Sequence, residues 1–145
     1  MTETLVGLVG ILVNVLGFFM VTRQMRMQAL ATRGETYTSL CGLSYDILKM
    51  IADRPFLFAY VYENKRLTPE TADSERVQVL ICCEMIANYC DNVVLQRENI
   101  PVKVWLQWRR FIKEQFSASA ELTVFVRQYE GWYSSDFSEI LKDLP

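Results

Sequence analysis

Two carboxylates and an amide could act together in the most apolar part of the chain. Glu84, Asn88 and Asp91 follow i, i+4 and i+7 spacing, which places them on one side of a helix. From there they could converge on a ligand, a cation or an arginine of a neighbouring helix. A narrow solvated face or an internal ion pair accounts for the same residues, and we favour that interpretation.

The absence of histidine restricts the chemistry of this chain more than any other feature. It excludes Ser-His-Asp and Cys-His catalysis, H-E-x-x-H zinc sites and E-x-x-H di-iron bundles. The four cysteines lack C-x-x-C spacing, so we expect reduced, apolar core residues. The formal net charge is -2 and no basic block is present, which argues against nucleic acid as a partner. We therefore predict no enzymatic activity, no catalytic residue, no metal and no cofactor.

A second candidate site is an aromatic segment that ends in basic residues. Its members are Phe56, Phe58, Tyr60, Tyr62, Lys65 and Arg66. The segment could dock a partner or touch lipid headgroups, because Tyr is amphipathic and basic side chains favour an anionic leaflet. A helix packed beneath the bundle accounts for it equally well. Trp105 and Trp108 could stack a planar ligand, but their apolar stripe makes the core the better interpretation.

These candidates must be positioned by helices, because the apolar spacing is helical along the chain. It predicts helices over residues 5–53, 56–62, 76–96, 102–116 and 122–130, with a last short helix capped near Ser134. Asp53-Arg54-Pro55 should end the first helix, and Gly42 should mark its close contact with another helix. The 76–96 helix is apolar enough for the centre of a bundle, with Leu80 and Met85 in the core.

The first helix begins with a charge-free run of nineteen residues, from Thr4 to Thr22. At the helical rise it is about 28 Å long, close to a hydrocarbon core of about 30 Å. A cleaved signal peptide carries its positive charges before the apolar run, whereas Arg23, Arg26 and Arg33 follow this one. We therefore expect an uncleaved membrane span with the N-terminus outside and residues 23–145 in the cytoplasm.

Small and polar residues form a stripe on one side of this span. Gly7, Gly10, Asn14 and Gly17 have 3-4-3 spacing, which keeps them on the same helical face. Glycines let helix backbones approach closely, and an amide in lipid requires a hydrogen-bond partner. The stripe predicts packing against a second copy or another membrane protein. Alternatively, in an oligomeric pore, it lines a conduction path.

Loose aromatic patterns suggest a family. The segment from Arg54 to Leu67, Trp105-x-x-Trp108-x-x-Phe111 and Trp132-Tyr133-Ser134 carry the likeness. In these features the chain resembles uncharacterised bacterial proteins with one membrane span and a small helical cytoplasmic domain. The resemblance covers most of the chain after Arg23 and implies a location in the bacterial inner membrane. It transfers no activity and no site residue.

The sequence thus predicts an all-α protein of two parts. Residues 1–22 are a transmembrane anchor, and residues 23–145 continue from it into a cytoplasmic bundle of four to five helices. The predicted function is that of a single-pass, membrane-anchored interaction or regulatory protein whose partners are lipid and itself or another membrane protein. The alternative is an oligomeric pore or membrane effector with a cytoplasmic sensor domain.

Overall fold

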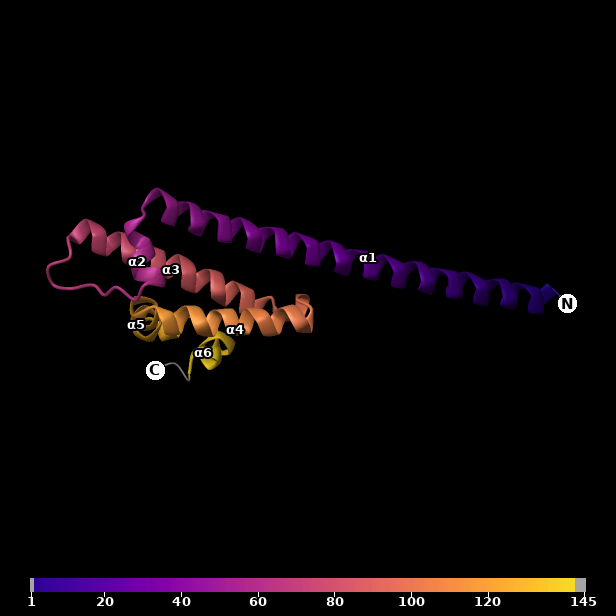
Figure 1. The fold of residues 1–145 in the computed structure, drawn as a ribbon. Helices are drawn as coiled ribbons and strands as arrows, with labels where there is room; N and C mark the ends of the chain where they lie inside the picture. Colours follow the sequence, from indigo (N-terminus) through magenta and orange to yellow (C-terminus); the bar gives the residue numbers. More distant parts are fainter. Residues whose placement is uncertain (1, 143–145) are drawn as a thin grey trace. The chain divides into compact units, whose positions relative to one another are not determined.

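A computed structural model describes the backbone of residues 2–142 and the side chains of residues 18–36 and 38–142. This part of the chain is helical and contains no strand (Figure 1). The α-helices are α1 (Thr2–Asp53), α2 (Phe56–Tyr62), α3 (Asp73–Leu95), α4 (Val102–Ala118), α5 (Ala120–Gln128) and α6 (Ser135–Leu141). Short 3₁₀ helices lie at Arg97–Asn99 and Glu130–Trp132. The predicted all-α class is confirmed.

The chain divides into two units, Met1–Tyr37 and Thr38–Pro145. The predicted boundary at residue 22 marked the end of the apolar run, whereas this division falls further along α1. The second unit, called here the helical bundle, comprises the end of α1 together with α2 to α6. Its described residues contain six α-helical segments, one more than the four to five predicted for the bundle.

The predicted long first helix is confirmed, since α1 runs without a break from Thr2 to Asp53. Neither Gly34 nor Gly42 interrupts it. The expected close contact at Gly42 is wrong for the described residues, because a Cβ built there would have no neighbour within 4 Å. In the bundle α1 instead buries Leu40, Ile47 and Ile51, which follow helical spacing on another side.

The central helix of the bundle is α3, as predicted. It contacts α2, α4, α5 and α6 and lies beside α4 (Figure 1). Its buried residues are Val79, Cys82, Cys83, Ile86, Ala87, Tyr89, Cys90, Val93 and Val94. Leu80, however, is 36% exposed, and its neighbours Val77 and Ile81 are more exposed still. The expectation of a core Leu80 is wrong because it lies at the edge of the buried face, near the start of the helix, and not within that face.

Among the described residues one helix, α3, is long and apolar enough to cross a membrane. Half of the most apolar stretch of α3 is buried inside the bundle, as expected for a central helix. Most of the predicted span, residues 4–17, has side chains outside the described set.

Two buried side chains at the end of α4 fix the end of α2. The Ser119 hydroxyl donates to the Tyr60 carbonyl at 2.8 Å, and the Gln115 amide donates to the Val61 carbonyl at 3.1 Å. The last carbonyls of a helix have no partner within it, so these bonds supply what the short α2 lacks. Ser119 also accepts from the Leu122 backbone N–H at 3.2 Å and thereby caps α5.

The loop after α2 makes two further bonds to α5. The Asn64 side chain accepts from the Ala120 N–H at 2.8 Å, and the Glu121 carboxylate accepts from the Leu67 N–H at 2.9 Å. Asn64 has a φ of 56°, in the left-handed region that Asn tolerates better than most residues. The loop and the α4–α5 junction therefore interlock through polar bonds in both directions.

Candidate functional site

The predicted aromatic segment divides into an exposed part and a buried part. Phe58 and Tyr62 are 47% and 42% exposed, and their ring centroids lie 4.9 Å apart. Phe56 is also exposed, whereas Tyr60 is buried. The alternating spacing of the aromatics did not predict this division, because alternate residues of a helix do not lie on one face.

The basic end of the segment is partly engaged within the bundle. The Tyr60 hydroxyl donates to the Glu75 carboxylate at 2.7 Å, and Lys65 Nζ lies 3.1 Å from the same oxygen. Lys65 Nζ also lies 4.4 Å above the centre of the Tyr60 ring. Hydrogen bonds from Tyr60 and Lys65 lower the pKa of Glu75, and the same cluster raises the pKa of Lys65. Arg66, the second basic residue, is exposed.

The predicted trio on α3, two carboxylates and an amide, divides into two exposed side chains and one that bonds within the bundle. Glu84 and Asn88 are exposed, and Asp91 is half-buried. The Asp91 carboxylate accepts from the backbone N–H of Ser134 at 3.3 Å and from the Ser134 hydroxyl. Ser134 in turn accepts from the Phe137 N–H at 3.2 Å, so Asp91 positions the N-terminus of α6. In the described part of the chain, no three acidic or cysteine side chains gather where they could hold a metal.

The two tryptophans of α4 pack against the core, which supports their structural interpretation. Trp108 makes edge-to-face contacts with Tyr89 at 5.9 Å and Phe111 at 5.6 Å between ring centroids. Such pairs stabilise a core beyond the area that they bury. Both tryptophans remain half-buried, so their outer edges contact solvent.

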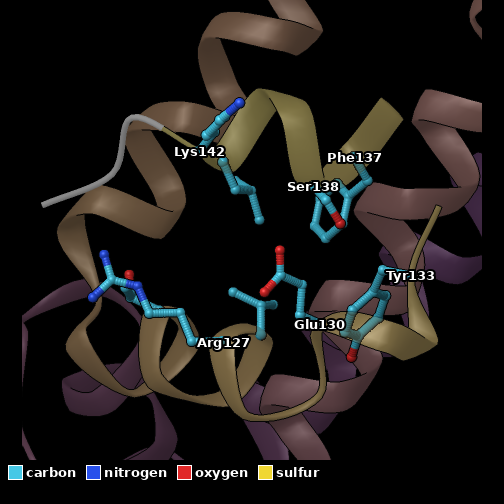
Figure 2. A pocket seen from close by; sticks show the side chains of 9 residues that line it. Arg127, Glu130, Tyr133, Phe137, Ser138 and Lys142 are labelled. Atoms are coloured by element: carbon cyan, nitrogen blue, oxygen red, sulfur yellow. The ribbon is translucent and has the colours of Figure 1, made fainter. Parts of the chain in front are cut away.

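A cavity of about 430 Å³ lies between α5, the second 3₁₀ helix and α6 (Figure 2). Val126 and Phe137 form buried parts of its wall. The Glu130 carboxylate points into the cavity, between Arg127 on one wall and Lys142 on the other (Figure 2). Sequence reasoning missed this cavity because its residues come from three short elements and form no motif. Its charges could hold a small polar ligand.

Tyr133 also lines this cavity, but its hydroxyl is buried without a hydrogen-bond partner in the described structure. Burial, reinforced by the negative charges of Glu84 and Asp91, raises the pKa of Tyr133 to about 12. A phenol with this pKa keeps its proton near neutral pH, so it is poorly suited to act as a general base.

The predicted glycine stripe, Gly7, Gly10, Asn14 and Gly17, belongs to α1, and its side-chain surroundings lie outside the described residues. The end of the apolar run is described. Phe18, Phe19, Met20 and Val21 are 55–77% exposed. The Thr22 hydroxyl donates to the Phe18 carbonyl at 2.8 Å, within the same helix.

Comparison of the chain with known protein families, with curated proteins and with solved structures finds no match.

Proposed function

We propose that this protein is a membrane-anchored helical interaction or regulatory protein. Residues 4–22 hold it in a bacterial inner membrane, and the same helix packs against a second copy or another membrane protein. The observation that carries the proposal is the unbroken α1, from Thr2 to Asp53, which makes the whole charge-free run helical. Lipid offers no hydrogen bonds to the backbone, so only a segment that satisfies its own can cross it as a single helix.

The described end of the run has the character of the boundary between a span and its flank. Four consecutive large apolar side chains, Phe18 to Val21, leave more than half of their surface uncovered by the chain. Consecutive residues cover all sides of a helix, so one packing partner cannot shield all four. Lipid can. Thr22 supports this reading, because its hydroxyl is satisfied by its own helix.

The charges that follow support a cytoplasmic bundle. Arg23, Arg26 and Arg33 lie after the run. Cytoplasmic flanks of membrane helices carry an excess of Lys and Arg. A cytoplasmic location also agrees with the four free cysteines, because thiols stay reduced there.

Self-association tests the proposed role of the span. Gly10→Leu and Gly17→Leu should disrupt assembly by steric bulk, and Asn14→Leu should weaken it, since interhelical hydrogen bonds contribute about 0.6 to 2 kcal/mol. Leu12→Ala, on another side of the helix, is the matched control. The measurement is the mass of the full chain in lipid nanodiscs. A wild type that is monomeric, or stripe variants that keep its mass, would contradict self-association.

The same variants separate this function from the alternative of a pore. Vesicles containing the wild-type protein should show no ion flux, because three glycines and one amide provide few polar groups to line a conduction path. Flux that disappears in Asn14→Leu would instead establish the pore.

A further inference from the structure

A second cavity, of about 260 Å³, lies within the bundle where α1, α3 and α4 meet the end of α2. We infer that it binds a single aliphatic hydrocarbon chain, such as the chain of a fatty acid or of a lipid. This inference goes beyond the proposed function, because anchoring and self-association make no use of the cavity.

The walls of the cavity are apolar and buried. Ile47 from α1 and Ile86 and Cys90 from α3 line it, and none of them is more than 7% exposed. Burial raises the pKa of the Cys90 thiol to about 12, so the thiol remains neutral and behaves as a small apolar group. The deep part of the cavity therefore offers a hydrocarbon surface.

The rim consists of large apolar side chains that the bundle leaves half uncovered. Leu48, Tyr62 and Phe111 are 55%, 42% and 43% exposed, and they come from three different helices. A hydrocarbon chain lying between these three side chains would remove apolar surface of both the ligand and the protein from water. The removal of apolar surface from water is the main driving force for such binding. Contiguous exposed apolar side chains around a concave site are typical of ligand-binding positions.

The lining also determines which ligands do not fit. None of the residues that line the cavity carries a charge, unlike the cavity of Figure 2 with its Arg127, Glu130 and Lys142. The Gln115 amide, the most polar side group present, already donates to the Val61 carbonyl. A phosphate, an amine or a carboxylate would thus lose its hydration without gaining a charged partner. The charged end of an amphiphile must stay at the mouth.

The volume agrees with a hydrocarbon of moderate length. An apolar cavity of roughly 150 Å³ in a protein core stays dry and binds benzene. The present cavity is larger and opens to the surface, so it can admit several methylene groups from one end. Each additional buried methylene should strengthen binding by about fourfold until the cavity is full.

Photolabelling of the full chain in membranes tests the inference. The two probes are a free fatty acid with a diazirine in mid-chain and a phospholipid that carries the same chain, and mass spectrometry of the digested protein locates the label. We expect label on peptides that contain Leu48, Cys90 or Phe111. Whichever of the two probes labels these peptides identifies the source of the hydrocarbon chain.

Cavity-filling variants provide the control for specificity. Ile86→Phe fills the deep part, and Ser44→Phe fills the mouth at a half-buried position that should tolerate bulk. Both should lose most of the cavity label. Ser39→Phe adds the same ring at an exposed site of the same helix and should keep it. Circular dichroism establishes that each variant is folded.

The outcomes distinguish this inference from the proposed anchor. Label within residues 4–22 but not at the cavity would overturn the inference and leave the anchor intact. Label at the cavity that persists in folded Ser44→Phe and Ile86→Phe would also overturn it, since the probe would then lie elsewhere. Label at the cavity that these variants abolish would establish it, whether or not residues 4–22 are labelled.

Discussion

Ser119→Ala should be among the most destabilising small substitutions in the bundle. The Ser119 side chain is fully buried and makes two bonds at once. Its hydroxyl donates to the Tyr60 carbonyl at 2.8 Å and accepts from the Leu122 N–H at 3.2 Å. Alanine fits the space but removes both bonds, so a carbonyl of α2 and an amide of α5 lose their partners.

The cost follows from the two losses. Replacing an N-cap serine by alanine costs about 0.5–2 kcal/mol. A buried carbonyl left without a partner costs about 1–3 kcal/mol. The losses share one hydroxyl and do not add fully, so we expect the free energy of unfolding to fall by about 2–4 kcal/mol.

Urea denaturation followed by tryptophan fluorescence measures this effect. All three tryptophans, Trp105, Trp108 and Trp132, lie in the bundle, so the signal reports its unfolding and not that of the N-terminal part of α1. Ser117→Ala is the matched control, because Ser117 is exposed and two residues away, and it should change stability by less than about 0.5 kcal/mol. Equal stability of the two variants would refute the interlock between α2 and α5.

Further effects are expected at Tyr133, at the cysteines and at the Glu75–Lys65 pair. Tyr133→Phe should raise the free energy of unfolding by about 1 kcal/mol in urea titrations, because it removes a buried hydroxyl that has no partner among the described residues; a loss of stability would reveal a partner. At neutral pH a maleimide should modify Cys41, which is exposed, while burial raises the pKa values of the other three thiols to about 11–12 and should protect them until the bundle unfolds. Because the pKa of Glu75 is lowered in the fold, its contribution to stability is complete above the unfolded-state value of about 4.3 and declines as the pH falls toward the lowered one. Urea midpoints of Glu75→Gln should therefore vary less with pH than those of the wild type between pH 3 and about 6. The pKa of Lys65 is raised, so the contribution of Lys65 to stability is complete below about pH 10.4 and declines above that pH.

The helices themselves were predictable because their signals are local. The unbroken spacing before Pro55 predicted α1, and the apolar run after Asp73 predicted the central α3. Ser134 was recognised as a cap and does accept from the Phe137 N–H. Caps and periods depend on neighbours within four residues, so a single sequence contains them.

Which apolar side chains face the core was less predictable, because it depends on partners far along the chain. Leu80 and Ile81 belong to an apolar helix, yet Leu80 lies only at the edge of the face that the neighbouring helices cover, and Ile81 lies beyond it. Tyr60 is buried among exposed aromatics because Ser119 and Glu75, distant in sequence, bond to it. Asp91 has its role through Ser134, and no spacing rule connects residues separated by 43 positions. The two cavities likewise arise only when separate helices meet.

Extraction of membranes at alkaline pH tests whether residues 4–22 anchor the protein. Membranes of bacteria that express the full chain are washed with sodium carbonate, which removes peripheral proteins but not membrane-spanning ones. The wild type should remain in the membrane pellet, and a variant with Leu8→Arg, Leu12→Arg and Leu16→Arg should be released, because each arginine at the centre of a span costs about 2.5–3.5 kcal/mol. Release of the wild-type protein into the supernatant would show that residues 4–22 do not anchor it.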